Sequence, residues 1–204
     1  MPALLKKITN TLVARPLLRY RLNVVGTNFR LGYASEIHTP KAFSIGDNFF
    51  TGPYAYFSTN IATPIKIGDD VMFGPYCKIL GGNHNTTWNG GPMNMAPWLG
   101  PGKGIIIESD VWIGAGATIL DGAFISEGAV IGAGSVVNNF IPPYSIAAGA
   151  PCHPKKLRLT TKNLEILLTA KESKYSSRDV IAAFSERSAA SSAPLSADVL
   201  KVLT

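Results

Sequence analysis

The chain has 204 residues, of which 46% are hydrophobic and only 16% are charged, and its formal net charge is +6. This length suits one globular domain with short extensions, and no apolar run is long enough to span a bilayer. The basic excess lies in residues 1–35, which contain no acidic residue, while basic and acidic residues balance in the rest of the chain. We expect no nucleic-acid partner.

Residues 1–35 are predicted to form a basic, helical segment outside the main domain. The stretch "LLKKITNTLV" has apolar residues at helical spacing until Pro16 interrupts it. Two interpretations stay open: the helix caps one end of the domain that follows, or residues 1–21 contact an anionic membrane surface. No secretory signal is recognisable. We expect a cytoplasmic protein, which the membrane interpretation would place at the inner membrane face, with Cys77 and Cys152 unpaired.

Residues 36–158 repeat with a period of six, which neither a helix nor an ordinary strand explains. An aliphatic residue recurs at every sixth position: Ile107, Ile113, Ile119, Ile125, Ile131 and Val137. Such periods are typical of β-helices, in which three short strands form one triangular coil of about eighteen residues. We therefore expect an all-β solenoid with these residues inside. The spacing does not give its handedness, although crossovers between parallel strands are normally right-handed.

Two earlier blocks continue the same period. Ile67, Phe73 and Ile79 share one phase, and Ile45, Thr51 and Phe57 share another. In the earlier block, Ile61 is predicted to point inward four residues after Phe57. Four extra residues, 63–66, are expected to separate the two blocks.

The repeat is interrupted between about residues 81 and 105 by a segment rich in Gly and Pro. A solenoid accommodates such an insertion as a loop that leaves a corner, and loops of this kind are commonly functional. His84 stands at the root of the loop, flanked by Asn83 and Asn85. Trp88 and Trp98 lie further along, and they suit either stacking on a sugar ring or packing against a neighbouring subunit. For the two asparagines, the alternatives are binding the acceptor and stabilising the loop.

Residues 159–204 form a C-terminal extension that is predicted to begin as a helix. The stretch "LRLTTKNLEILLTAKES" has leucines at helical spacing. The Ser- and Ala-rich sequence near the C-terminus is typical of mobile chain.

Taken together, four features resemble the hexapeptide-repeat acyltransferases over about residues 40–158. They are the repeats, "GNHN" at the loop root, the restart "DVWIGAGATI" and the ending "VVNNFIPPYSIAAGAPCHPKKLR". The most similar branch holds galactoside, maltose and xenobiotic acetyltransferases and polysaccharide O-acetyltransferases. This resemblance implies a left-handed parallel β-helix, a homotrimer with active sites between subunits, and acetyl-CoA as the donor in a direct transfer.

The resemblance also implies site residues at the positions that match the family's motifs. His84 matches the catalytic histidine, and Trp112, Gly114 and Ala115 match positions beside the thioester. The positions that hold the rest of the cofactor are matched by Ala133, Gly134, Asn138, His153, Lys155 and Lys156.

Two departures from the family's pattern concern the phosphate groups of the cofactor. Asn138 and Asn139 stand where Thr-Lys is common, and His153 stands where Arg is frequent. Lys155 is our candidate for the missing phosphate contact.

The expected reaction is transfer of an acetyl group from acetyl-CoA to a hydroxyl of a saccharide or glycan precursor. His84 would act as the general base, the amide of Ala115 would stabilise the oxyanion, and the candidate acceptor-binding residues are Asn83, Asn85, Trp88 and Trp98. The alternatives are another small acceptor (a sugar amine, an amino acid hydroxyl or an antibiotic) and a non-catalytic scaffold. Zinc chemistry would need three converging histidines. His38, His84 and His153 lack that spacing, so we expect no metal.

Overall fold

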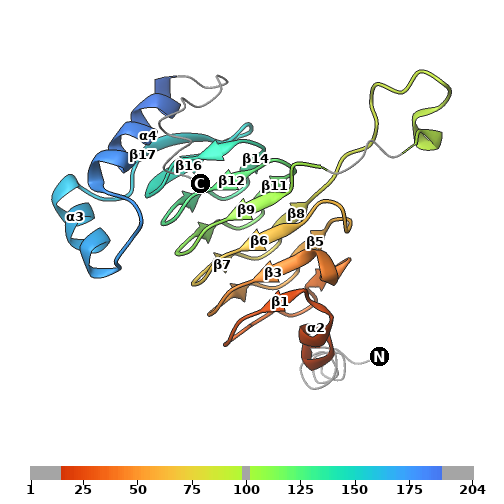
Figure 1. Cartoon of the computed structure of the whole chain (residues 1–204), viewed down its shortest axis with the longest axis horizontal. Coiled ribbons are helices and arrows are strands. Elements are labelled where there is room, and N and C mark those ends of the chain that lie inside the picture. Colours follow the sequence, from red (N-terminus) through yellow and green to blue (C-terminus); the bar gives the residue numbers. More distant parts are fainter. Residues whose placement is uncertain (1–14, 98–101, 190–204) are drawn as a thin grey trace.

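The computed structural model describes residues 15–97 and 102–189, which form a parallel β-helix with an extruded loop and a helical C-terminal extension (Figure 1). The described strands form three sheets, here named A, B and C. Sheet A contains β1 (Val24–Val25), β3 (Phe43–Ile45), β6 (Ile65–Ile67), β9 (Ile105–Ile107), β12 (Phe124–Ile125) and β15 (Phe140–Ile141). Sheet B contains β4 (Phe50–Thr51), β7 (Met72–Phe73), β10 (Trp112–Ile113), β13 (Val130–Ile131), β16 (Ser145–Ala148) and β17 (His153–Leu157). Sheet C contains β2 (Glu36–Ile37), β5 (Tyr56–Ser58), β8 (Lys78–Leu80), β11 (Thr118–Leu120) and β14 (Val136–Val137).

The chain passes from sheet A to B to C in every coil, so the three corners of the prism are named AB, BC and CA. Strands pair in parallel with the equivalent strand one coil away, as Trp112 pairs with Met72 on one side and with Val130 on the other. The exception is β17, which turns back and pairs antiparallel with β16. Because each coil contacts only its neighbours, stability accumulates along the stack.

The core consists of the inward residues that the hexapeptide period predicts. From Ile107 to Val137 the residues in this phase are at most 1% exposed. The residues four positions after them are also buried, among them Val111, Ala117 and Ala129. The period therefore predicted the inward rows of the regular coils correctly.

The prediction for Ile61 is wrong, because its side chain is 66% exposed. The inward position belongs instead to Thr63, which is fully buried two residues later. Its hydroxyl oxygen accepts a hydrogen bond from the Gly102 amide at 3.1 Å, which satisfies a polar group inside the coil. The extra residues therefore lie before Thr63, and part of the predicted insertion 63–66 is the strand β6.

The coil begins within the segment that the sequence assigned to the N-terminal extension. Val24 and Val25 pair with Ser44 and Ile45, and Arg30 forms a bridge with Phe50. The helix α2 (Arg15–Arg21) lies at this end of the prism, beside the short helix η2 (Pro40–Ala42) (Figure 1). The predicted amphipathic stretch, residues 4–13, lies outside the described residues.

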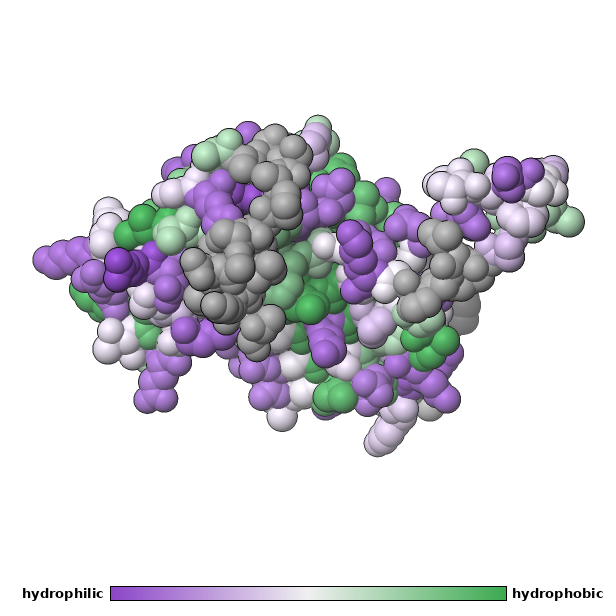
Figure 2. All heavy atoms as spheres, turned by 45° about the horizontal axis from the view of Figure 1, so that its top comes forward, coloured by the Kyte–Doolittle hydropathy of each residue, from purple (hydrophilic) through white to green (hydrophobic). Residues whose placement is uncertain are grey.

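The interruption of the repeat is a loop that leaves the CA corner after β8 and returns at β9 (Figure 1). Its described part contains the short helix η3 (Met93–Met95). Figure 2 shows this loop standing away from the body with a largely polar surface. The predicted extruded loop is therefore present, except that Ile105 already belongs to the returning strand.

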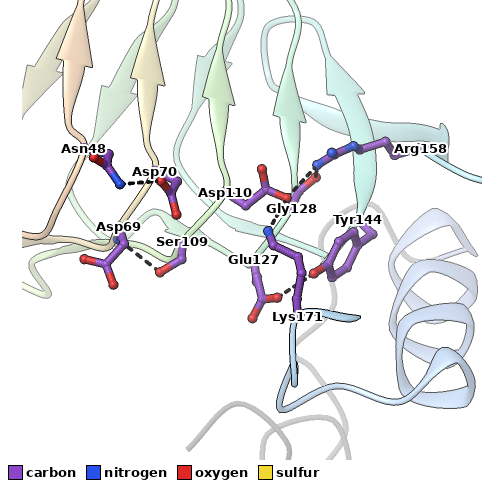
Figure 3. Close-up of polar contacts among 10 residues, drawn as sticks. All are labelled: Asn48, Asp69, Asp70, Ser109, Asp110, Glu127, Gly128, Tyr144, Arg158 and Lys171. Carbon is purple, nitrogen blue, oxygen red and sulfur yellow. Dashed lines mark hydrogen bonds and ion pairs between the residues drawn. The ribbon is translucent and has the colours of Figure 1, made fainter. Parts of the chain in front are cut away.

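The helices α3 (Thr161–Ala170) and α4 (Ser177–Ala189) cover the C-terminal end of the coil (Figure 1). They enclose a second, smaller core of buried residues: Tyr144, Leu164, Leu168, Tyr175 and Val180. Polar contacts join this extension to the AB corner. Arg158 and Lys171 both bind the Asp110 carboxylate, at 3.1 and 2.7 Å, as Figure 3 shows.

Candidate active site

The BC corner is built from three-residue turns that stack along the prism. The turns of four consecutive coils are residues 52–54, 74–76, 114–116 and 132–134. The amide of the third residue donates to the carbonyl of the second residue one coil earlier: Tyr76 to Pro53 at 3.0 Å, Gly116 to Pro75 at 2.9 Å and Gly134 to Ala115 at 2.8 Å. Equivalent positions of the four turns therefore form straight columns.

The middle column changes its chemistry between the second and third of these turns. Pro53 and Pro75 occupy it first, and proline has no backbone N–H. Ala115 and Ala133 follow, and both residues are exposed. Within the described part of the chain, neither of their amides donates to a protein group. These four turns thus present two unpaired N–H donors, one coil apart, at Ala115 and Ala133.

Close packing explains the glycines at the start of these turns. A Cβ atom placed on Gly114 would stand 2.6 Å from both the Ala133 nitrogen and the Ile131 carbonyl oxygen, which is closer than real Cβ atoms approach. A side chain at Gly114 would therefore push successive turns apart. Gly114, which the resemblance places beside the thioester of the cofactor, therefore has a structural role. It holds the amides of Ala115 and Ala133 in register.

Trp112 lies on the outer face of sheet B, directly before this corner. Its side chain is 51% exposed. Met72 and Phe50 precede it in the same outward row, and Val130 follows it. The row is an apolar strip that runs along the wall of the prism beside the two free amides, so the structure brings Trp112, Gly114 and Ala115 together.

His84 lies in the extruded loop, four residues beyond β8, and its side chain is exposed. Within residues 15–97 and 102–189, its imidazole has no hydrogen-bond partner. The loop leaves the CA corner, whereas Ala115 lies at the BC corner, so sheet C separates the two in one chain. A single chain therefore does not place His84 beside the unpaired amide of Ala115.

Two other candidate residues of the loop, Asn85 and Trp88, have local contacts in this structure. The Asn85 carboxamide oxygen accepts hydrogen bonds from the amide and the hydroxyl of Thr87, at 3.2 and 3.0 Å, which supports its interpretation as a loop-stabilising residue. The Trp88 ring covers Gly90, where an added Cβ would overlap it. Asn83 is exposed, and Trp98 lies outside the described residues.

The expected phosphate-binding residues lie at the C-terminal end of the coil. Lys155 and Lys156 are exposed on β17, and His153, on the same strand, pairs with Ala148. Asn138 is exposed at the CA corner, while the side-chain nitrogen Nδ2 of its neighbour Asn139 donates a hydrogen bond to the Cys152 carbonyl oxygen at 3.1 Å. Asn139 therefore fixes the β17 hairpin to the last coil.

Two polar atoms near this hairpin have no protein partner among the described residues: Asn139 Oδ1 and His153 Nδ1, both of which are buried. The described residues also contain no group of three or more His, Cys, Asp or Glu side chains that could hold a metal ion.

The change of residue type along the BC corner was not used in the prediction from sequence. The four turns read "GPY", "GPY", "GAG" and "GAG" in chain order. Among these four turns, the change from GPY to GAG marks the coil at which the unpaired amides begin, and this change was visible in the sequence. Its meaning depends on the stacking of the turns, which only the fold supplies.

Comparisons with known proteins agree with this architecture. The chain is 34% identical to the galactoside O-acetyltransferase of Lactococcus lactis over 163 residues, which cover 75% of this chain and 74% of that protein. The crystal structure of a maltose O-acetyltransferase from Clostridium difficile 630 is 28% identical, with a TM-score of 0.64, and the match covers 76% of this chain and 83% of that one.

A third similar protein was solved with its acyl donor. It is a hexapeptide-repeat-containing acetyltransferase from Vibrio cholerae O1 biovar eltor, complexed with acetyl coenzyme A. It is 26% identical, with a TM-score of 0.60, and the match covers 78% of this chain and 86% of that one. No protein-family model matches the chain. The sequence relationship and the shared coil architecture together confirm the expected fold: this chain is a left-handed β-helix protein and belongs to the hexapeptide-repeat acetyltransferases, in the galactoside and maltose O-acetyltransferase branch.

Proposed function

We propose that this chain transfers an acetyl group from acetyl-CoA to a hydroxyl group of a saccharide or glycan precursor. The observation that carries this proposal is the pair of unpaired, exposed amides of Ala115 and Ala133 in one straight column. An amide that already lacks a protein partner is ready to donate to a carbonyl or an oxyanion without losing another hydrogen bond.

Acetyl-CoA would lie along the BC corner, parallel to the axis of the prism. The Ala133 amide and the small surface of Gly134 suit the pantetheine arm, since a Cβ added to Gly134 would meet no atom within 4 Å. The phosphates would reach the C-terminal end of the coil, where Lys155 and Lys156 offer cationic donors. His153 and Asn138 lie in the same region, and the thioester would then stand at the level of Ala115, next to Trp112.

The imidazole of His84 would remove the proton from the acceptor hydroxyl as that oxygen attacks the thioester carbonyl carbon. An unperturbed imidazole is largely neutral and basic near pH 7. The tetrahedral oxyanion that forms would accept a hydrogen bond from the Ala115 amide. When the C–S bond breaks, the imidazolium would give this proton to the departing thiolate of CoA, so CoA leaves as the thiol and His84 ends neutral.

This mechanism requires two copies of the chain at each site. His84 and Ala115 lie at different corners of one prism, so a neighbouring subunit has to supply one of them. A closed ring satisfies this requirement for every copy, and the proposed assembly is a homotrimer. The exposed Trp88 and Asn83 on the extruded loop would contact the acceptor from the same side as His84.

The cellular setting that fits this reaction is the cytoplasm, with modification of a polysaccharide or its precursor. The basic residues of the segment 1–21 would favour contact with the anionic inner face of a membrane. Among the described residues, no helix has the length and apolar character that crossing a bilayer requires.

The test is a panel of acceptors incubated with purified protein and acetyl-CoA. Release of free CoA thiol and mass spectrometry of the products would be followed together. The expected result is a mass increase of one acetyl group on at least one saccharide, with the ester sensitive to mild base. Acetylation confined to amines or to non-saccharide alcohols would contradict the proposed acceptor class, and a lack of any acetyl-CoA consumption would contradict the proposal as a whole.

A further inference from the structure

Two tyrosines occupy positions of the BC corner that normally suit glycine. Tyr54 and Tyr76 both have a φ of 60°, in the left-handed region. Bulky residues rarely adopt this conformation, because their Cβ atoms crowd the backbone. The side chains are also 46% and 58% exposed. Burial of the rings within this chain therefore does not explain why tyrosine occupies these two positions.

The two rings form the end of an aromatic stack. The centroids of Tyr54 and Tyr76 are 5.1 Å apart and the rings are nearly parallel, at 5°. Tyr33 contacts Tyr54 edge-on from the previous coil, with centroids 5.8 Å apart. Tyr54 therefore covers the face of the Tyr76 ring that points toward the N-terminal end of the coil.

The next position in the same column is Gly116, which has no side chain to cover the other face of Tyr76. Gly116 has the same left-handed conformation, with a φ of 69°, so a side chain there would continue the stack. Instead, a Cβ atom placed on Gly116 would meet nothing within 4 Å. The stack of rings is thus followed by a gap, and the gap lies beside the unpaired amide of Ala115.

The chemistry around this gap suits an uncharged ring with one apolar face. The turns 52–54, 74–76 and 114–116 contain no charged residue. A tyrosine ring offers a flat apolar face for C–H groups, and its hydroxyl offers a polar edge. A pyranose has the matching properties, with axial C–H bonds on its faces and hydroxyl groups around its rim.

We propose that Tyr76 is a specificity-determining residue that stacks on the C–H face of an acceptor pyranose placed in the gap at Gly116. Tyr54 and Tyr33 hold the Tyr76 ring in position. This inference rests on the proposed function, and it adds that the acceptor is a ring-form saccharide. It also gives an order along the BC corner: the donor's pantetheine arm at Gly134, the thioester at Ala115, and the acceptor ring between Gly116 and Tyr76.

The test compares Tyr76→Asn with the unsubstituted protein, using methyl β-galactopyranoside and glycerol as acceptors. Asparagine tolerates the left-handed conformation, so this change removes the ring without adding backbone strain. The expected result is a rise of about ten-fold in KM for the pyranoside, which corresponds to ~1.4 kcal/mol of lost binding. The KM for glycerol and the Kd for acetyl-CoA should change less than two-fold, and Tyr76→Phe should keep most of the preference for the ring.

Two further variants separate binding from packing. Gly116→Asn fills the gap with a residue that accepts its backbone conformation, and it should also weaken the pyranoside selectively. Asp70→Asn changes a left-handed residue at another corner of the same coil, with a φ of 56°, and should leave both acceptors unaffected. Saturation-transfer NMR on the unsubstituted protein should place the strongest signals on one face of the pyranoside.

Three outcomes would overturn the inference. An unchanged KM for the pyranoside in Tyr76→Asn would remove Tyr76 from the acceptor site while leaving the proposed function intact. Dissociation of the oligomer in the same variant would show that the ring contacts a second copy of the chain instead. Failure of the unsubstituted protein to acetylate any saccharide would overturn both this inference and the proposed function.

Discussion

The Cα atom of Gly114 lies so close to Ala133 in the next coil that a Cβ atom there would stand 2.6 Å from the Ala133 nitrogen. The neighbouring atoms are backbone, so they cannot move aside without disturbing the column. We expect Gly114→Ala to lower the free energy of unfolding by about 1–3 kcal/mol, as overpacking does in well-packed sites. Urea unfolding at fixed protein concentration measures this change. Gly116→Ala is the comparison, because its added methyl meets open space and only the backbone strain remains; an equal or larger loss there would contradict the packing argument.

Ala115→Pro tests the proposed oxyanion donor without changing the turn. Proline already occupies this column at Pro53 and Pro75, each preceded by a glycine, so the backbone at Ala115 should accept it. The substitution removes one N–H, and we expect kcat to fall by about 10²–10³-fold, the effect of deleting an oxyanion-hole donor. The thermal unfolding temperature should not fall. Pro53→Ala is the control, since it adds an N–H two coils away and should leave kcat unchanged.

His84→Ala should abolish most of the transfer while leaving the fold intact. Loss of a positioned general base lowers the rate by about 10²–10⁴-fold. The side chain is exposed and has no partner in the described part of the chain, so its removal should not change the unfolding temperature. Steady-state rates with a responsive saccharide measure the effect. His38→Ala is the matched control, because His38 is also exposed and its side chain contacts Glu36, at 3.0 Å, and the Tyr56 ring, away from the BC corner. Equal losses in both variants would exclude a specific role for His84.

The sequence predicted the regular coils well because an aliphatic residue at every sixth position fixes which side chains face inward. It failed where the period is interrupted. Ile61 has the expected spacing and hydrophobicity, yet Thr63 takes its place inside, with a hydroxyl satisfied by the Gly102 amide. That partner lies 39 residues away, so local sequence could not identify it. The start of the coil, at Val24–Val25 and the bridge of Arg30, was missed because it lies in the basic segment that was assigned to the N-terminal extension.

Some residues of the candidate site could be predicted, but the contacts between coils could not, because they depend on the fold. His84 and Ala115 were assigned by resemblance to the family and not by their spacing in this chain. The stacking of Tyr54 and Tyr76 could not be predicted, because it depends on residues one coil apart sharing a column. The sequence also gives no direct indication that sheet C separates His84 from Ala115, which is what makes a second copy of the chain necessary.

Asp110→Asn tests how the C-terminal extension is held on the coil. The Asp110 carboxylate binds Arg158 at 3.1 Å and Lys171 at 2.7 Å, and all three side chains are partly buried (Figure 3). Asparagine suits the left-handed backbone at this position, so mainly the two ion pairs are lost. We expect a loss of about 1–2 kcal/mol and faster hydrogen exchange in α3. Asp70→Asn is the control: among the described residues, the Asp70 carboxylate accepts a hydrogen bond only from the Asn48 side chain, and asparagine can still accept that bond.

Alkaline pH should destabilise the folded chain through buried groups whose pKa is raised, among them Cys152, Tyr144 and Tyr175. Burial raises the pKa of the Cys152 thiol to about 11. Burial, together with the nearby carboxylates of Glu127 and Glu108, raises the pKa of Tyr144 and of Tyr175 above the ordinary tyrosine value. All three groups are neutral when protonated, so the folded state holds these protons more tightly than the unfolded chain does.

The sign of the pH dependence follows from this difference in proton affinity. Each group contributes fully to the free energy of unfolding below its pKa in the unfolded chain, which is about 8.5 for cysteine and about 10 for tyrosine. This contribution is lost as the pH rises toward the pKa of the group in the folded state. Urea unfolding should therefore show a stability that is level between about pH 7 and 8 and that declines above about pH 9. Tyr175→Phe should lose stability at pH 8, because the hydrogen bond to Glu108 at 2.8 Å is gone, yet decline less steeply above pH 10. Tyr20→Phe, at a site that is 89% exposed, should keep the original slope; a Tyr175→Phe slope equal to that of the unsubstituted protein would remove Tyr175 from the groups that cause the alkaline loss.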